Sequence, residues 1–245
     1  MAQVRLDKYL SNAGCGTRSE VKQLLKKGLV WVNGEAAKKP EQKIDPETDE
    51  ICCGESRILR EEFQYYMLNK PSGYVSATRD LYQPVVLDLI KVPGKEALFP
   101  VGRLDIDTEG LLLLTNDGVL AHELLSPRKH VDKMYFAKLD QPAGERDIEQ
   151  FQEGLEIGEK KKTLPARLEI GEDGTQVRVT IREGKFHQIK RMFQAVGKQV
   201  VYLKRLSMGS LMLDEDLKPG EWRKLTEQEI EGLRAHVRTE KSSHL

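Results

Sequence analysis

The hydrophobic and polar positions of the amino-terminal part predict two short helices and a β-hairpin. Apolar residues recur at helical spacing over residues 6–13, and the glycines that follow end this helix. Thr17 and Glu20 form a capping box that begins a second helix, because the side chain of each can bond the backbone amide of the other. The dipeptide Asn33-Gly34 lies between two short strand-like runs and favours a tight hairpin turn.

From Phe63 onward, the pattern changes to strands joined by turns that contain glycine or proline. Strands are predicted at residues 64–69, 74–77, 111–116, 133–139, 166–170, 176–181, 199–206 and 222–225. Helices are predicted at 118–125, 145–153, 184–197 and 227–238, the third with Phe186, Ile189, Met192, Phe193 and Val196 facing inward. Because strands predominate without a regular strand–helix–strand repeat, we predict an α+β fold. We place a small domain at residues 1–60 and a larger domain, with a mixed, mainly antiparallel sheet, at residues 61–245.

Composition indicates a soluble protein. Of the 245 residues, 39% are hydrophobic and 32% are charged. No apolar run approaches the roughly 18 residues that a membrane span needs, and the amino terminus has no apolar signal core, so we expect a cytoplasmic protein without a membrane segment. Cys15, Cys52 and Cys53 lack Cys-x-x-Cys spacing, so we expect neither a structural zinc site nor a disulfide framework.

The net charge of zero conceals a basic amino-terminal region. Residues 1–43 contain nine lysines and arginines against four acidic residues, a local excess of five positive charges. Arg18, Lys22 and Lys26 recur every four residues and therefore share one face of the second predicted helix. Such a face can be simply solvated, or it can bind the phosphates of a nucleic acid.

An acidic segment at residues 102–110 is the main candidate for chemistry. Asp105, Asp107 and Glu109 lie between a glycine and an apolar run that reads as a buried strand. Two carboxylates could act as an acid and a base, as in glycoside cleavage, but residues two apart in an extended segment are separated by about 7 Å rather than about 5 Å. A magnesium site and a single catalytic aspartate both stay open on these residues alone.

Three motifs of the amino-terminal part occur together. They are Arg5-Leu6-Asp7-Lys8-Tyr9-Leu10, Thr17-Arg18-Ser19-Glu20-Val21 and Gly28-Leu29-Val30-Trp31-Val32-Asn33-Gly34. Together they resemble the S4 RNA-binding domain. This resemblance implies that the helices and the hairpin grip structured RNA, mostly through phosphates, which positions the RNA without reading its sequence. It places the RNA contacts at Arg5, Lys8, Arg18, Ser19, Lys22 and Lys26.

Four further motifs follow in the larger domain. They are Leu68-Asn69-Lys70-Pro71-x-Gly73-Tyr74-Val75, the segment 102–118, Lys133-x-Tyr135 and the segment 183–193. In this order they resemble the RNA pseudouridine synthases that carry an amino-terminal S4 domain. The resemblance implies cleavage of the bond between ribose C1′ and uracil N1, rotation of the base and rejoining through C5, without cofactor or metal. It favours small-subunit 16S ribosomal RNA as the substrate, with large-subunit 23S RNA as the alternative.

The same resemblance assigns roles to individual residues. Asp105 is the essential carboxylate, Lys190 is the cation that keeps it ionised in a closed pocket, and Tyr135 stacks on the target base. Arg103 helps to fill the space that the extruded base leaves. Further contacts with RNA are expected at Lys70, Arg128, Lys133, His187 and Arg191.

Two other classes of protein remain as rivals. One is a non-catalytic RNA-binding ribosome-assembly factor, against which the presence of Asp105, Tyr135 and Lys190 counts. The other is a nucleoside hydrolase with an RNA-binding appendage. We expect a monomer whose partner is ribosomal RNA, either free or within a ribosomal subunit assembly intermediate.

Overall fold

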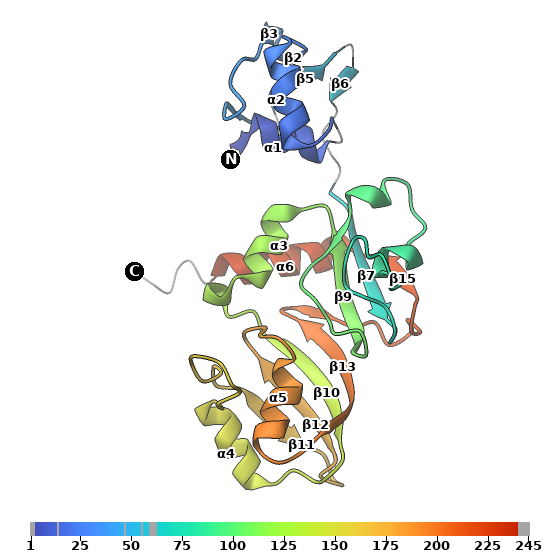
Figure 1. The fold of residues 1–245 in the computed structure, drawn as a ribbon, viewed down its shortest axis with the longest axis vertical. Helices are drawn as coiled ribbons and strands as arrows, with labels where there is room; N and C mark the ends of the chain where they lie inside the picture. Colours follow the sequence, from blue (N-terminus) through green and yellow to red (C-terminus); the bar gives the residue numbers. More distant parts are fainter. Residues whose placement is uncertain (1–2, 14, 47, 55, 59–62, 240–245) are drawn as a thin grey trace. The chain divides into compact units, whose positions relative to one another are not determined.

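The computed structural model describes residues 3–13, 15–46, 48–54, 56–58 and 63–239 (Figure 1). The chain divides into two compact units, Met1–Phe63 and Gln64–Leu245. The boundary predicted near residue 60 and the frayed tail predicted at residues 241–244 lie outside the described residues.

The amino-terminal unit combines helices α1 (Leu6–Asn12) and α2 (Arg18–Lys26) with short antiparallel strands. The predicted capping box is present at α2, where the Thr17 amide donates to the Glu20 carboxylate at 2.6 Å and the Glu20 amide donates to the Thr17 hydroxyl at 3.3 Å. The Asn33-Gly34 turn joins β2 to β3, and both of its residues have positive φ. The strands form the pair β1 (Val4–Arg5) and β4 (Lys43–Ile44) and the sheet β3 (Glu35–Ala36), β2 (Val30–Val32), β5 (Ile51–Cys53) and β6 (Ser56–Ile58).

Among the described residues of the larger unit, nine strands form one mixed sheet. Its order is β11-β12-β10-β13-β9-β7-β15, with β14 beside β13 and β8 beside β9. Within this part of the chain, β9 and β13 pair in parallel and the other pairs are antiparallel, which confirms the predicted α+β class and sheet type. The strands are β7 (Tyr65–Lys70), β8 (Phe99–Pro100), β9 (Glu109–Thr115), β10 (Lys133–Leu139), β11 (Arg167–Ile170), β12 (Gln176–Ile181), β13 (Val200–Met208), β14 (Leu211–Met212) and β15 (Trp222–Lys224).

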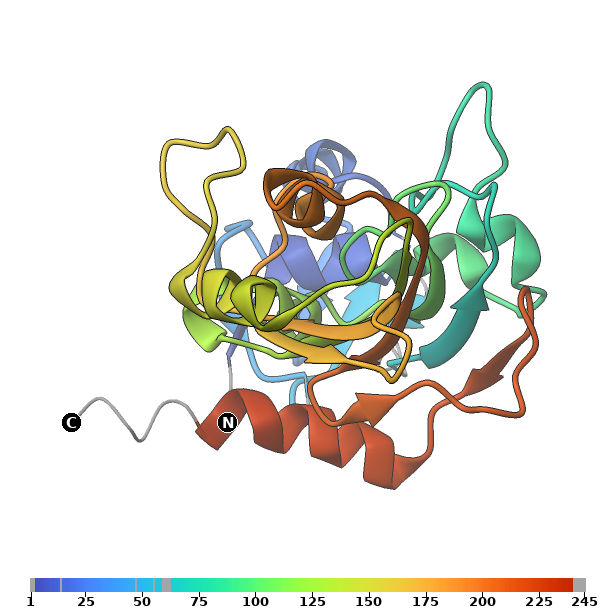
Figure 2. The same ribbon diagram turned by 90° about the horizontal axis from the view of Figure 1, so that it is seen from below.

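Helices cover the two faces of the sheet at different places (Figures 1 and 2). Helices α3 (Gly118–Leu125) and α6 (Glu227–Thr239) pack against one face of β7 and β9, whereas α4 (Glu145–Glu153) and α5 (Gln188–Ala195) cover the other face over β10 to β13. The run Leu111–Leu114 sends alternate side chains into both cores and is fully buried. Short 3-10 turns occur at Val86–Leu89, Pro127–Lys129 and Lys95–Ala97.

Two predicted elements differ from the structure. Residues 74–77 do not form a strand of the sheet, since their ladder contact is an isolated bridge between Val75 and Val85. The helix predicted from residue 184 begins at Gln188, because His187 has a left-handed φ of 48° and makes the preceding residues a turn. Phe186, which was predicted to face inward, is consequently 73% exposed.

Two findings on the described residues bear on the expectations drawn from composition. No helix among them combines the length and the apolar character that a bilayer span requires. The thiols of Cys15, Cys52 and Cys53 are free and partly buried.

Candidate active site

The acidic loop is held in place where strands β9 and β13 run side by side. Gly110 pairs with Arg205 across this parallel ladder and has a φ of 99°, which favours glycine. A Cβ atom at position 110 would overlap the backbone oxygen of Arg205. Glycine therefore allows the close approach that fixes the carboxyl-terminal end of the loop.

Lys70 supports the acidic loop from inside the protein. Its side chain is fully buried, and its Nζ donates to the backbone oxygens of Thr108 at 2.8 Å, Asp105 at 3.1 Å and Ile106 at 3.2 Å, as well as to that of Pro71. Burial lowers the pKa of Lys70 to about 8, although the nearby carboxylates act in the opposite direction. The prediction that Lys70 contacts RNA is wrong, because its ammonium is enclosed and bonded to the loop.

Asp105 faces two basic side chains from the start of α5. Its carboxyl side chain is 27% exposed, so it is accessible without being fully solvated. His187 Nε2 lies 3.6 Å from Asp105 Oδ1, and Lys190 Nζ lies 3.5 Å from Asp105 Oδ2. The structure thus brings together the predicted catalytic carboxylate and its predicted cation.

Lys190 binds Asp107 more closely than it binds Asp105. Its Nζ donates to the two carboxylate oxygens of Asp107 at 2.6 and 2.7 Å. Partial burial raises the pKa of Asp107, but the hydrogen bond and the charge of Lys190 outweigh burial and leave this pKa below its usual value. The ammonium is therefore shared, with Asp107 fixing its position and Asp105 experiencing its charge.

Tyr135 lies at the pocket that opens beside Asp105. The ring is on β10 and is 7% exposed, and it lines the pocket together with apolar side chains of neighbouring elements. These side chains form an apolar surface beside the carboxylate, on which a flat ring can lie. The pocket is also lined by Arg103, Leu104, His187, Ile189 and Leu203.

Sequence reasoning missed two hydroxyl groups beside this pocket. The buried hydroxyl of Ser76 donates to the Leu104 carbonyl at 2.9 Å and accepts from the Leu104 amide at 3.1 Å, which fixes the residue next to Asp105. The Thr108 hydroxyl is buried and has no hydrogen-bond partner within the described part of the chain. No pattern in the sequence distinguishes these hydroxyl groups from ordinary surface ones.

One further predicted RNA contact in the larger unit, Lys133, is also wrong. Lys133 is 7% exposed and donates to the Val131 carbonyl at 3.0 Å, and burial, with a contribution from Arg205, lowers its pKa to about 8. The Arg191 guanidinium donates to Glu159 at 2.9 Å and to the Phe186 carbonyl at 3.0 Å, so it links two loops. Its side chain is 24% exposed, and its contact with RNA stays a prediction.

The other predicted contacts of this unit are accessible or lie outside the description. Arg103 is exposed at the mouth of the pocket, and the side chain of His187 is 41% exposed. The side chain of Arg128 lies outside the described residues.

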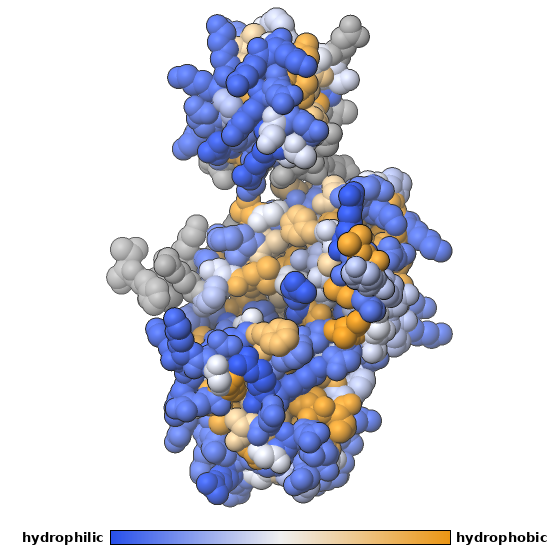
Figure 3. Space-filling model, in the orientation of Figure 1, coloured by the Kyte–Doolittle hydropathy of each residue, from blue (hydrophilic) through white to orange (hydrophobic). Residues whose placement is uncertain are grey.

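The amino-terminal unit presents its predicted basic face on α2. On the side shown in Figure 3, this unit is covered largely by hydrophilic residues. Arg5 differs from the others, because it uses two donors on the buried carboxylate of Asp7, and these hydrogen bonds lower the pKa of Asp7. Lys8 is partly buried, whereas the exposed members of the set are Arg18, Ser19, Lys22 and Lys26.

Glu109 has a different partner from the other two carboxylates of the acidic loop. Asp105 and Asp107 face Lys190, whereas Glu109 accepts a hydrogen bond from the Tyr202 hydroxyl at 2.7 Å. Burial and this carboxylate raise the pKa of Tyr202 to about 12. Over the described residues, no group of three or more potential metal ligands is found. Asp105 and Asp107 therefore share the charge of Lys190, whereas Glu109 is held by a phenol hydroxyl.

Comparisons with known proteins agree with these features. A family model described as RNA pseudouridylate synthase matches residues 64–195, and the S4 domain matches residues 4–51. The chain is 49% identical to an uncharacterised RNA pseudouridine synthase of Bacillus subtilis (strain 168), covering 93% of this chain and 97% of that protein. It is 43% identical to ribosomal small subunit pseudouridine synthase A of Escherichia coli (strain K12), covering 93% and 98%.

A solved structure extends the similarity to three dimensions. A crystal structure of a pseudouridylate synthase matches with a TM-score of 0.69 and 42% identity, over 94% of this chain and 99% of the other. The match spans the acidic loop, the Lys133-x-Tyr135 motif and α5, which together build the pocket described above. The chain belongs to the RNA pseudouridine synthase family and carries the family's domain in combination with an S4 domain.

Proposed function

We propose that this enzyme converts one uridine of small-subunit (16S) ribosomal RNA to pseudouridine. The observation that carries the reaction is that Asp105 lines a pocket together with Tyr135 and lies 3.5 Å from the ammonium of Lys190. The substrate is supported by the 43% identity to a ribosomal small subunit pseudouridine synthase, which extends over nearly the whole of both chains. The large-subunit alternative rests on sequence motifs alone.

In this proposal, Asp105 is the group that attacks the nucleotide, either by adding to the ribose or by removing a proton from it. The ammonium of Lys190 at 3.5 Å stabilises the ionised carboxylate by its charge. The bond between C1′ and N1 breaks, and C1′ then bonds to C5 of the same base. C5 loses a proton and N1 gains one, so the composition of the nucleotide does not change.

The pocket can hold the base during this rotation. The Tyr135 ring, with Leu203 and Ile189, offers a flat apolar contact. A base can rotate against such a surface more readily than in a set of directional hydrogen bonds. The uridine must first leave its stack, at a cost of a few kcal/mol. Arg103, exposed at the pocket mouth, is placed to occupy the vacated position in the RNA.

Contacts away from the pocket offset the cost of extrusion. We assign this role to the exposed side chains of α2, which would bind phosphates and would make affinity depend on salt concentration. We propose that the enzyme works as a monomer in the cytoplasm, on ribosomal RNA that is free or part of an assembling subunit.

The test is to map pseudouridines in ribosomal RNA from cells with and without this gene. The proposal predicts the loss of one site in 16S RNA and its restoration by the wild-type gene. Loss of a site in 23S RNA would move the substrate to the large subunit, and an unchanged map would favour the non-catalytic assembly factor. Free uracil released from RNA by the purified protein would indicate a hydrolase.

A further inference from the structure

Phe186 is an exposed aromatic residue at the active site to which the reaction assigns no role. Its side chain is 73% exposed, whereas Gln188 and Ile189, two and three residues later, are buried. The left-handed conformation of His187 ends the turn at this point and keeps Phe186 out of the helical stripe that would have buried it. A single exposed apolar residue is common, so its surroundings decide whether it has a function.

The Phe186 ring forms a stack that begins at the catalytic carboxylate. The rings of Phe186 and His187 are stacked with centroids 3.7 Å apart and an interplanar angle of 19°. The Nε2 atom of His187 is in turn 3.6 Å from Asp105 Oδ1. The His187 ring therefore lies between Asp105 and the Phe186 ring. The two rings are stacked at a spacing close to that of stacked bases.

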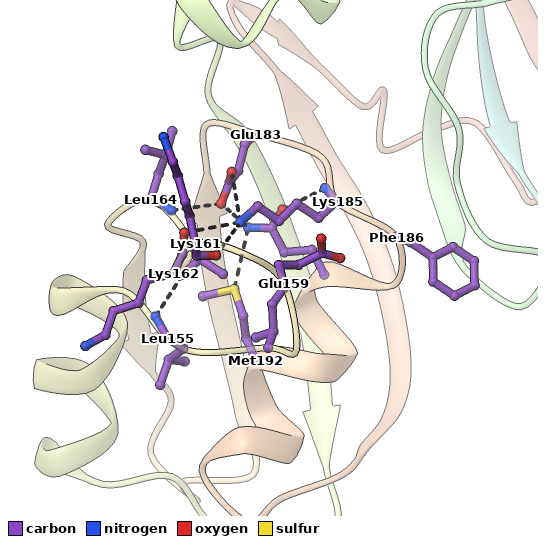
Figure 4. A network of polar contacts seen from close by, with 12 residues as sticks. Leu155, Glu159, Lys161, Lys162, Leu164, Glu183, Lys185, Phe186 and Met192 are labelled. Atoms are coloured by element: carbon purple, nitrogen blue, oxygen red, sulfur yellow. Dashed lines mark hydrogen bonds and ion pairs between the residues drawn. The ribbon is translucent and has the colours of Figure 1, made fainter.

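A network of hydrogen bonds holds the turn that carries Phe186. Figure 4 shows this network on one side of the turn and the Phe186 ring pointing away from it. The Phe186 carbonyl accepts from Arg191, and the Lys185 amide donates to the Gln188 side chain at 2.9 Å. The remaining bonds join Lys185 Nζ to the carbonyls of Lys161 and Lys162 and join Gln188 to Glu183.

This combination of a fixed backbone and an uncovered ring suits a binding surface. A side chain that is already ordered loses little conformational entropy when a ligand covers it. Phe rings bind unstacked RNA bases by stacking, whatever the identity of the base. Extrusion of the target uridine exposes faces of its neighbours, which then need a new stacking partner.

We propose that Phe186 binds the RNA substrate by stacking on a nucleobase adjacent to the target uridine. This inference rests on the proposed function, since it requires an RNA whose uridine enters the pocket at Asp105. Phe186 is then a binding residue that helps to keep the opened RNA in place while Asp105 acts on the extruded nucleotide.

The test is a double-mutant cycle between the protein and the RNA. The RNA is a short oligoribonucleotide centred on the modified uridine, with each base flanking that uridine replaced in turn by an abasic nucleotide. Binding is measured in the Asp105→Asn background, which prevents turnover, with Phe186 either intact or changed to Leu. For one flanking position, we expect each single change to weaken binding by about tenfold and the combination to be no weaker than either alone.

Further variants separate stacking from a structural role. Phe186→Trp should keep the affinity, because it retains a flat ring, and Phe186→Leu should leave the thermal midpoint unchanged, because the side chain is mostly exposed. Val119→Ala is the matched control, since Val119 is an apolar residue of α3 that is 58% exposed. It should change neither affinity nor activity.

The outcomes distinguish this inference from the proposed function. If the wild-type enzyme forms pseudouridine and Phe186→Leu binds every oligoribonucleotide as tightly as the parent, the inference is overturned and the proposed function stands. Additive losses at all flanking positions would also overturn it. If the wild-type enzyme forms no pseudouridine in any ribosomal RNA, the proposed function fails, and the inference fails with it.

Discussion

Replacement of Lys70 by Met should displace the acidic loop and lower activity while leaving the overall fold intact. Methionine has a similar length but cannot donate to the backbone oxygens of Asp105, Ile106 and Thr108. Each hydrogen bond from a charged donor contributes about 1.5–3 kcal/mol, so the loss of these three bonds costs about 5–9 kcal/mol before any compensation. The variant also avoids the free-energy cost of burying a charge. That cost is about 3 kcal/mol, because the pKa falls from 10.5 in free lysine to about 8 in Lys70.

Subtracting the cost of the buried charge from the gross loss of hydrogen bonds gives a net destabilisation of roughly 2–6 kcal/mol for Lys70→Met. Denaturant unfolding measures this quantity, and pseudouridine formation should fall by about 100-fold, because a misplaced carboxylate loses its alignment with the nucleotide. Lys91→Met is the control, since Lys91 is an exposed lysine of the same unit. Wild-type stability and activity in Lys70→Met would refute the role assigned to this side chain.

The same substitution predicts a pH dependence with a definite sign. The folded protein lowers the pKa of Lys70 to about 8, so between that pH and 10.5 the unfolded chain binds more protons at this residue than the folded protein. Stability contributed by Lys70 therefore rises with pH across this range. Unfolding curves at several pH values should show the advantage of the wild type over Lys70→Met increasing above pH 8, and a decreasing advantage would contradict the assignment.

Three other substitutions test separate parts of the mechanism and the fold. Lys190→Met should lower pseudouridine formation by at least about tenfold, with Lys190→Arg retaining more activity, because the charge beside Asp105 is lost only in the first. Arg18→Glu combined with Lys22→Glu should weaken RNA binding and flatten its salt dependence by about one unit per charge, and an unchanged salt slope would remove α2 from the interface. Gly110→Ala should yield little folded protein by circular dichroism, because its Cβ overlaps the backbone of β13.

Local signals in the sequence predicted the elements whose causes are themselves local. The capping box of Thr17 and Glu20 and the Asn33-Gly34 turn depend on neighbouring residues, and both are present. The run Leu111–Leu114 is apolar at every position, which fits its burial on both faces of the sheet. The class of the fold followed from the same patterns.

The errors concern residues whose environment is created by distant parts of the chain. Lys70 and Lys133 look like surface lysines at the ends of strands, and their burial depends on carbonyl groups that the folded chain turns toward them. The pairing of Lys190 with Asp107 depends on how the loop turns between two carboxylates. The early start predicted for α5 failed because the backbone of His187 is left-handed, which its side chain does not signal.

In the proposed reaction, Asp105 alone supplies the catalytic carboxylate. The most direct test of this role is the release of tritium from RNA labelled at C5 of uridine, measured with the wild-type enzyme and with Asp105→Asn at equal RNA occupancy. We predict that the variant binds RNA nearly as tightly as the wild type and releases no tritium above background. Release by Asp105→Asn at a rate near that of the wild type would contradict this claim.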